Sequence, residues 1–311
     1  MTKGIHHITA IASDGQKNHY FYSHILGLRL VKKTVNQDDI GTYHLFFGDR
    51  EGHPGMDLTF FIFKPSMQGK RGNGLVTTIS LAVPEDSLTF WQERFVKQAV
   101  KHEKIVTRFG KKRILFYDAD DQQLELVGLP TSELDETKDL WTTKEIRTQH
   151  AIRHFYSATL SMPSKVGVEE ILVTAFGYKP VLKEETITLY EVQHSKRAAF
   201  LEIDENPSRE FGLNAAGTIH HIAFRARDEA HQLELQQAIT NLGIQTTQVI
   251  DRFYFKSIYF RTSAGILFEI ATDTPGFTAD ENVEELGTKI ALPPFLESKR
   301  ALIESNLPVI K

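Results

Sequence analysis

Apolar and polar residues follow one plan that recurs four times along the chain. Each copy begins with a short, mostly apolar run typical of a β-strand, continues with an amphipathic helix and closes with two or three further strand-like runs. The opening runs are residues 5–11, 76–83, 155–161 and 219–226, roughly 65–80 residues apart. A unit of this size is too small to bury a hydrophobic core alone. The pattern therefore predicts an α+β protein of four βαβββ modules that pack against one another.

The predicted helices occupy residues 17–26, 87–99, 165–175 and 229–242. In the last of them, Leu235, Ala238, Ile239 and Leu242 recur at the spacing that gives a helix one apolar face. Three of the helices are followed by glycine, which is expected at a left-handed helix end. The closing strands are predicted in pairs at residues 42–47 and 56–63, 113–117 and 123–128, 186–192 and 198–203, and 257–261 and 266–271.

Polar linkers suggest how the modules are grouped. The segment 131–149 is charged and holds few apolar residues, so we place the domain boundary there. The N-terminal half, residues 1–135, then holds modules at 4–65 and 75–130. The C-terminal half, residues 150–275, holds modules at 151–205 and 218–273. A C-terminal tail follows at 276–311, with a short helix predicted at 295–305.

Composition excludes several classes of function. The 311 residues carry a formal net charge of −4, which gives no reason to expect nucleic acid or an anionic membrane as a partner. No apolar run approaches the roughly 18 residues needed to span a bilayer, and the N-terminal residues lack the apolar core of a signal peptide. The chain has no cysteine, which rules out disulfides and thiolate ligands. We therefore expect a cytoplasmic protein, and leave a homo-oligomer open.

Two histidine pairs and one glutamate are the candidate metal ligands. His6-His7 and His220-His221 open the first and last modules, and Glu269 interrupts an apolar run in the last predicted strand. A buried carboxylate in such a run costs several kcal/mol unless its charge is compensated, and a metal ion is a strong compensation. Strand alternation places the two histidines of each pair on opposite faces, but it does not choose between them.

The chain resembles the vicinal-oxygen-chelate superfamily, which includes glyoxalase I and the extradiol ring-cleaving dioxygenases. The resemblance covers essentially the whole chain, and it is closer to the hydroquinone-type ring-cleaving dioxygenases. Any one similar stretch is weak evidence for the family, whereas the order and spacing of all the stretches together are specific to it. The similar stretches are residues 4–10, 30–36, 43–49, 218–224 and 265–269, with the tail at 275–278, 280–281 and 286–287.

The resemblance implies two paired vicinal-oxygen-chelate domains and one metal centre. The second histidine of the first module, the second of the last module and the strand glutamate would hold Fe(II), for which Mn(II) is an alternative. The expected substrates are dioxygen and a hydroquinone or catechol-like aromatic. Because one ion needs ligands from modules one and four, we expect those modules to pair, and modules two and three to form the other pair. The implied metal ligands are His7, His221 and Glu269; the implied catalytic residues are Tyr259, Arg252 and His6; the implied substrate-binding residues are Thr9 and His220.

Two other functions remain compatible with the same fold. A glyoxalase-type isomerase or lyase would use Ni(II), Zn(II) or Mn(II) with a fourth protein ligand. Aligning residues 55–59 with 265–269 places Thr59 opposite Glu269, and threonine is a poor ligand, although alternation alone does not exclude Asp57. A non-enzymatic binder of an aromatic ligand is the second alternative. His44 and His53 are given no role.

Modules two and three offer a weaker set of polar residues. Glu125 and Glu202 lie in their closing strands, but residues 78–80 are Thr-Ile-Ser where a histidine would be needed. We therefore predict that these carboxylates pair with basic neighbours such as Arg113 or Arg197, and that no second metal is bound.

Overall fold

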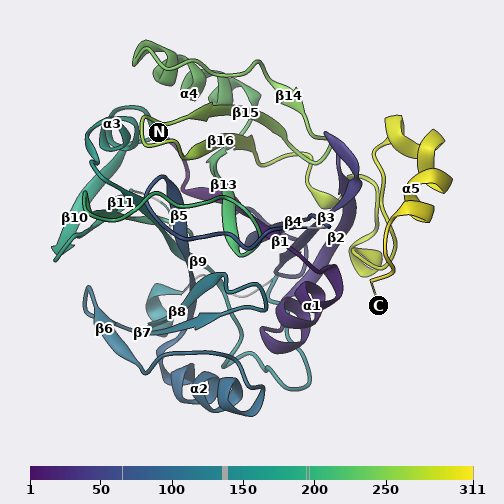
Figure 1. The fold of residues 1–311 in the computed structure, drawn as a ribbon, viewed down its shortest axis with the longest axis horizontal. Coiled ribbons are helices and arrows are strands. Elements are labelled where there is room, and N and C mark those ends of the chain that lie inside the picture. The colour runs from purple at the N-terminus through teal and green to yellow at the C-terminus, as the bar shows by residue number, and fades with distance from the viewer. Residues whose placement is uncertain (65, 135–138, 194, 196, 311) are drawn as a thin grey trace.

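The computed structural model describes residues 1–64, 66–134, 139–193, 195 and 197–310. Its strands form two curled eight-stranded sheets (Figure 1). The first sheet contains β1 (Ile5–Ala12), β2 (Arg29–Asn36), β3 (Asp39–Gly48), β4 (Asp57–Ile62), β13 (Thr218–Ala226), β14 (Ile250–Asp251), β15 (Lys256–Arg261) and β16 (Leu267–Thr272). The second contains β5 (Leu75–Pro84), β6 (Val106–Arg108), β7 (Lys111–Tyr117), β8 (Gln123–Leu129), β9 (His154–Met162), β10 (Tyr178–Glu184), β11 (Ile187–Val192) and β12 (Phe200–Glu205).

The strand order shows which modules pair. In the first sheet the order is β14-β15-β16-β13-β1-β4-β3-β2, so module four joins module one through the antiparallel strands β13 and β1. In the second sheet the order is β10-β11-β12-β9-β5-β8-β7-β6, so module three joins module two through β9 and β5. The predicted α+β class of paired βαβββ modules is confirmed, and so is the pairing of module one with module four.

The helices depart from the prediction in two modules. Helices α2 (Leu88–Lys97) and α4 (Glu229–Asn241) lie close to the predicted ranges. Helices α1 (Gly15–His19) and α3 (Val166–Glu170) are shorter, because each continues directly into a π-helical segment, Tyr20–Ile25 and Ile171–Ala175. Among the helices of the described residues, none has the length and apolar character needed to cross a membrane.

The strands that follow these π-helical segments were not predicted from the sequence. Strand β10 is a polar edge strand that contains Pro180. Strand β2 also lies at an edge and carries Lys32 and Lys33. Lysine and proline are common on edge strands, where they discourage pairing with other chains, and they remove the alternation by which a strand is recognised in a sequence.

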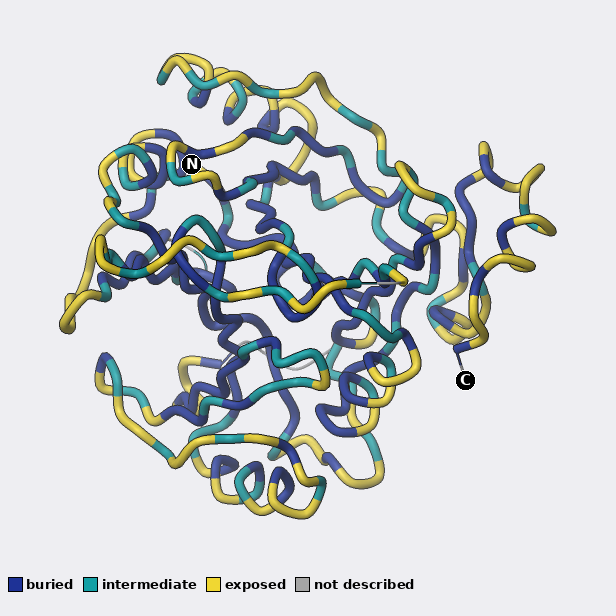
Figure 2. The backbone as a smooth tube through the Cα atoms, in the orientation of Figure 1, coloured by how far each residue is buried: buried dark blue, intermediate teal, exposed yellow. Residues whose placement is uncertain are grey.

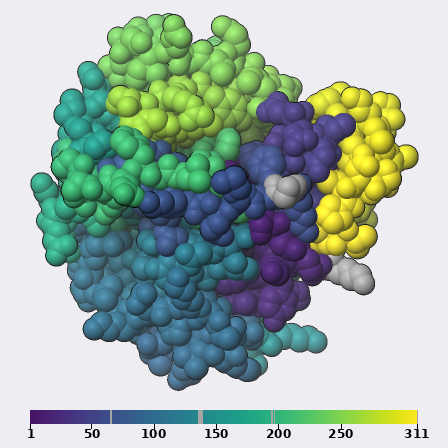
Figure 3. All heavy atoms as spheres, in the orientation of Figure 1, coloured from purple at the N-terminus to yellow at the C-terminus, as the bar shows by residue number. Residues whose placement is uncertain are grey.

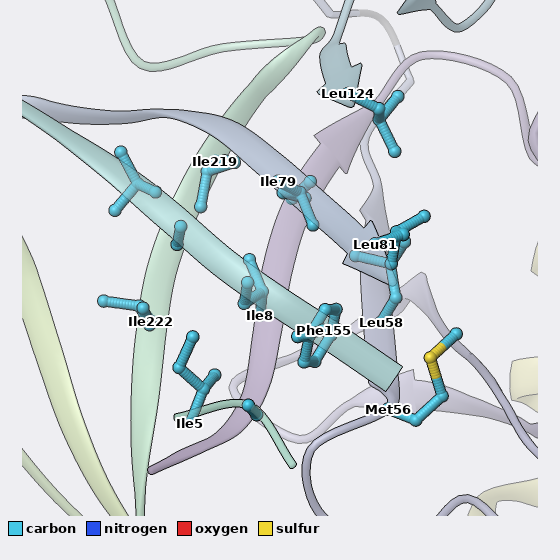
Figure 4. Packing of buried hydrophobic residues seen from close by; sticks show 14 of the residues in the cluster. Ile5, Ile8, Met56, Leu58, Ile79, Leu81, Leu124, Phe155, Ile219 and Ile222 are labelled. Atoms are coloured by element: carbon cyan, nitrogen blue, oxygen red, sulfur yellow. The ribbon is translucent and has the colours of Figure 1, made fainter. Parts of the chain in front are cut away.

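Apolar side chains of the central strands form the core between the two sheets. Ile5 and Ile8 of β1 and Ile222 of β13 lie close to Ile79 and Leu81 of β5 (Figure 4), and all five are fully buried. The central strands are buried along most of their length, whereas the outer faces of the helices are exposed (Figure 2). Because side chains alternate along a strand, every second residue of β1, β13 and β16 faces away from this core. That opposite face of the first sheet carries the polar residues described below.

The C-terminal tail covers the β2 edge of the first sheet, where it lies against module one (Figures 1 and 3). Ile290 forms a parallel bridge with Lys33. The fully buried ammonium group of Lys32 binds Asp280 at 2.7 Å, the carboxylate of Glu281 and the carbonyl of Phe277 at 3.0 Å. A buried ammonium with two carboxylates and a carbonyl is well compensated, so this contact anchors the tail. The tail ends in α5 (Arg300–Asn306), close to the predicted helix.

Candidate metal centre

Three buried donor atoms converge where modules one and four meet. His7 lies on β1, His221 on the neighbouring strand β13, and Glu269 on β16, which runs parallel to β13. The Nε2 atoms of His7 and His221 are 3.3 Å apart, and Glu269 Oε2 lies 3.3 Å from the first and 3.0 Å from the second. The structure thus brings together the three residues that the resemblance implied as ligands.

The charge of Glu269 is held in place by its surroundings. Burial raises the pKa of Glu269, but positive charge at His7 and His221 lowers it well below its usual range. A cation bound between the imidazoles would take the place of their protons and act on Glu269 in the same way. Ser257 Oγ on β15 donates a hydrogen bond to Glu269 Oε1 at 2.5 Å. The other oxygen, Oε2, receives no hydrogen bond from the described residues. It is therefore available to a cation.

The first histidine of each pair orients the second. His6 Nε2 lies 3.1 Å from the carbonyl oxygen of Thr272, which can only accept, so this nitrogen carries the hydrogen. The unprotonated His6 Nδ1 then accepts from His7 Nδ1 at 3.0 Å, which leaves a lone pair on His7 Nε2. His220 and His221 make the same contact between their Nδ1 atoms at 2.8 Å. Hydrogen bonds of this kind fix the tautomer of metal-binding histidines.

This contact differs from what strand alternation predicts, which is that His6 points away from His7. The pairing of β1 with β13 is irregular between Ile5 and Ile8, so the two rings meet edge to face with 5.1 Å between their centroids. Burial, followed by the proximity of His7, lowers the pKa of His6 well below its usual value. His6 is therefore neutral, as the hydrogen-bond pattern requires.

The donor set fits a divalent metal ion. Two imidazole lone pairs and a carboxylate oxygen within 3.0–3.3 Å of one another repel unless a cation lies between them. An ion about 2.1–2.2 Å from each donor would meet them at angles of about 90–100°, as on one face of an octahedron. Two histidines and one carboxylate in this arrangement are typical of non-haem iron centres, which keep open positions for other ligands.

Module one supplies no carboxylate to this centre. Strand register pairs Thr59 of β4 with Thr9 of β1, and Glu269 of β16 with Ala223 of β13, so Thr59 occupies the position equivalent to Glu269. Asp57 lies near His6 and His7, but burial, followed by the charges of Asp49 and Glu269, raises its pKa well above its usual value. Asp57 forms a separate group with His6 and His7 and does not converge with His221 and Glu269.

A cavity of about 50 Å³ adjoins the three donors. Tyr259 lines it from β15, where it is the cross-strand partner of Glu269. Arg252, just after β14, also lines the cavity, with its Nε 3.4 Å from Tyr259 Oη. Burial, followed by the charge of Glu269, raises the pKa of Tyr259, so its phenol stays protonated and can donate a hydrogen bond. The structure thus brings Tyr259 and Arg252 together at this cavity.

An ion pair closes the cavity between the edges of the first sheet. The guanidinium of Arg252 binds both carboxylate oxygens of Asp38 at 3.1 and 2.9 Å. Gln37 Nε2 donates to the carbonyl of Arg252 at 2.8 Å. Asp38 and Gln37 belong to the turn between β2 and β3, so these contacts join module one to module four across the cavity.

The structure does not place Thr9 and His220 in the cavity. Thr9 Oγ1 lies 2.7 Å from Thr59 Oγ1, and His220 lines a separate pocket beside Arg261. Burial, followed by the proximity of His221, lowers the pKa of His220 to about 3. The Nδ1 of His220 is directed at His221, and the hydroxyl of Thr9 is directed at Thr59. The geometry therefore does not support the predicted substrate-binding role of Thr9 or of His220.

Several residues at the site were not predicted from the sequence. Ser257 precedes Tyr259 by two residues, so alternation along the predicted strand could have shown that both share a face. His44 and Thr34 also line the cavity, and His44 Nε2 lies 2.9 Å from Thr59 Oγ1. Their position depends on the pairing of β2 with β3, and β2 had no recognisable strand pattern.

The second sheet carries an arginine where the first has its metal donors. In the strand register, Glu125 of β8 lies beside Ser80, and Glu202 of β12 lies beside Thr159. Each of these two glutamates therefore occupies the position that Glu269 occupies in its own module. The fully buried Arg113 binds both carboxylates through Nη1, at 2.8 and 2.7 Å. The prediction that these carboxylates pair with Arg113 is therefore confirmed.

The other basic neighbour considered in the sequence has a different partner. Arg197 binds Asp49, which directly follows β3 in module one. Arg108 instead joins Arg113, with its Nη2 3.1 Å from Glu125 and 2.9 Å from Glu202. Two guanidinium groups thus neutralise the two carboxylates.

The fold and the donor set together define a protein of paired βαβββ modules with one buried two-histidine, one-carboxylate centre. The sequence profile of the Glyoxalase/Bleomycin resistance protein/Dioxygenase superfamily matches residues 4–126 and 83–270. The chain belongs to this superfamily.

Similarity to individual proteins extends over the full chain. MhqE of Bacillus subtilis, provisionally named a ring-cleaving dioxygenase, is 40% identical over 99% of both chains. The chlorohydroquinone/hydroquinone 1,2-dioxygenase of Sphingobium indicum is 33% identical over 99% of this chain and 97% of that protein. A crystal structure described as a dioxygenase from Bacillus subtilis superimposes with a TM-score of 0.94 at 40% identity, covering 100% of this chain and 98% of the other. These similarities confirm the resemblance to ring-cleaving dioxygenases.

Proposed function

We propose that this protein is a metal-dependent ring-cleaving dioxygenase that acts on a hydroquinone or catechol-like aromatic, with Fe(II) as its metal and Mn(II) as the alternative. The observation that carries the proposal is the convergence of His7, His221 and Glu269 beside a cavity that also contains Tyr259 and Arg252. The names of the full-length relatives agree with it. A glyoxalase-type reaction is disfavoured because Thr59 takes the place of a fourth ligand.

The residues of the site can divide the work of ring cleavage. When bound, the metal would supply adjacent positions where a phenolate oxygen and dioxygen come together. His6 and His220 hold the two ligand imidazoles in the tautomer that presents Nε2. The phenol of Tyr259 and the guanidinium of Arg252 are positioned to stabilise negative charge that develops on oxygen. Phe61 and Phe255 provide apolar walls against which an aromatic ring can pack.

Oxygen uptake tests the proposal directly. Protein purified without oxygen would be loaded with Fe(II), Mn(II) or Zn(II) and supplied with hydroquinone, methylhydroquinone or catechol. We expect one dioxygen to be consumed per ring opened with Fe(II) or Mn(II), and both oxygen atoms to enter the product.

The control is Glu269→Gln, which keeps the shape of the side chain and removes its charge. Uptake no greater than that of Glu269→Gln with every metal and every substrate would refute the proposal. Isomerisation of a hemithioacetal by the same preparations would support the glyoxalase-type alternative instead.

A further inference from the structure

A pair of polar residues lines the cavity from module one. Thr34 of β2 and His44 of β3 are cross-strand partners, and such partners point to the same face of a sheet. Both line the cavity that also contains His7, His221 and Glu269. Module four supplies two of the three metal donors, His221 and Glu269. It also supplies Tyr259 and Arg252. Thr34 and His44 therefore add a polar group on the module-one wall.

Part of the hydrogen-bonding capacity of this pair is not used by the described residues. Thr34 Oγ1 is buried and has no hydrogen-bond partner among the described residues, and the whole residue is only 3% exposed. A buried hydroxyl without a partner is unfavourable, so its presence beside a cavity points to a ligand or an ordered water. His44 is bound at Nε2 by Thr59, and no hydrogen bond to its Nδ1 is found in the part of the chain that the structure describes.

The plane of the His44 ring is fixed. Phe46 and Phe61 lie against it, with ring centroids at 3.9 and 4.4 Å. Together with the bond to Thr59, these contacts hold the imidazole in one orientation. Side chains locked in this way lose little entropy when they bind a ligand, so a single hydrogen bond to His44 can contribute to affinity.

The internal repeat explains why His44 is free for this task. His44 pairs with Phe61, two residues beyond Thr59, just as Ser257 pairs with Ala271, two residues beyond Glu269. His44 is thus the counterpart of Ser257. Ser257 supports a metal donor, whereas His44 contacts Thr59, which is not a carboxylate. The position in module one therefore has no metal donor to support.

We propose that Thr34 and His44 form a subsite for a second hydroxyl group of the substrate, remote from the oxygen that approaches the metal donors. The proposal rests on the ring-cleaving function proposed above and narrows its substrate class. The Thr34 hydroxyl donates to the substrate oxygen, and the substrate hydroxyl donates to His44 Nδ1. Such a subsite favours a ring with oxygen at both ends, as in hydroquinone, over catechol, whose oxygens lie side by side, and over phenol, which has only one.

Ligand affinity measured without turnover tests the subsite. Zn(II)-loaded protein, free of oxygen, would be titrated with hydroquinone, catechol and phenol by calorimetry. We expect the wild type to bind hydroquinone about 3- to 10-fold more tightly than phenol, the effect of one to two hydrogen bonds. Thr34→Val and His44→Phe should each remove most of this preference, leave the affinity for phenol unchanged and retain the metal. His44→Gln, which keeps an acceptor, should restore part of it.

Thr42→Val on the same strand as His44 is the matched control, because the Thr42 hydroxyl binds Asp39 and does not line the cavity. It should keep the full preference for hydroquinone. If both cavity variants also keep it, the subsite is refuted while the ring-cleaving proposal stands. An equal change in affinity for hydroquinone and phenol refutes it too, because the side chains would then serve only ordered water or cavity shape. A wild type that binds none of the three ligands refutes the ring-cleaving function itself.

Discussion

Single side chains around the metal donors are arranged so that each ligand is oriented by a neighbour. Glu269 is oriented by Ser257, His7 by His6 and His221 by His220. Two of these neighbours directly precede the ligand in sequence, and the third lies on the adjacent strand. The site is therefore specified by short local segments once the strands are paired.

The Ser257 hydroxyl can be tested separately from the ligands. We expect Ser257→Ala to weaken metal affinity by about 10- to 100-fold, the usual effect of removing a hydrogen bond that orients a ligand. Metal content after dialysis against chelators of graded strength would measure it. The matched control is Ser80→Ala, which removes the hydrogen bond from Ser80 to Glu125 in the second sheet. An equal loss of metal in both variants would contradict the role of Ser257.

The phenol of Tyr259 should act on turnover and not on metal binding. We expect Tyr259→Phe to keep its metal and to slow ring opening by about 10²- to 10³-fold, because the lost hydrogen bond stabilises charge that develops only during oxygen attack. Single-turnover oxygen consumption at matched metal content would measure this. Equal rates in the variant and the wild type would reduce Tyr259 to a packing role.

At the level of elements, the two sheets solve the same electrostatic problem in different ways. Both place glutamates at equivalent positions of their closing strands, where burial makes an uncompensated charge costly. In the first sheet we propose that a metal ion compensates the glutamate. In the second sheet the guanidinium of Arg113, supported by Arg108, compensates both glutamates.

Removal of the Arg113 charge should destabilise the second sheet strongly. We expect Arg113→Met to lower the free energy of unfolding by about 3 kcal/mol or more at pH 7, because Glu125 and Glu202 would remain buried with Arg108 as their one basic partner among the described residues. Urea denaturation would measure the change. Adding Glu125→Gln and Glu202→Gln should recover most of the loss, and a cost below about 1 kcal/mol for Arg113→Met alone would contradict this account.

At the level of the whole molecule, an ion pair joins the two sheets. Asp49, directly after β3, binds Arg197 from the segment between β11 and β12, and accepts from His53 Nδ1 at 3.1 Å. Burial opposes the charged form, but the hydrogen bond from His53 and the charge of Arg197 outweigh it and lower the pKa of Asp49 to about 2.

The depressed pKa of Asp49 predicts a loss of stability in acid. Since the pKa falls from 3.8 to about 2 on folding, the contribution is complete above pH 4 and disappears as the pH falls through about 2. The difference corresponds to about 2 kcal/mol. Urea denaturation between pH 5 and 2 would show a shallower decline for Asp49→Asn than for the wild type. Parallel declines would contradict the assignment.

The repeat in the sequence was sufficient for the modules and for the equivalence of Thr59 with Glu269, because these depend on local patterns and a fixed period. The pairing of the modules was instead inferred from the metal ligands that the resemblance implied. The choice of His7 over His6 came from resemblance, since alternation treats both alike. The burial of Lys32 in a strand could not be predicted from the local sequence, because its partners, Asp280 and Glu281, lie in the distant tail. The neighbourhood of His44 and Thr34 was not predicted either, because it depends on the pairing of β2 with β3.

The guanidinium of Arg113 also bears on how the protein meets a variable supply of metal. Its charge is made with the chain during translation and remains for the lifetime of the molecule, whereas the ion proposed at His7, His221 and Glu269 would have to be acquired from outside. The two buried glutamates of the second sheet therefore have a counter-charge that comes with the chain itself, whatever the supply of metal around the protein.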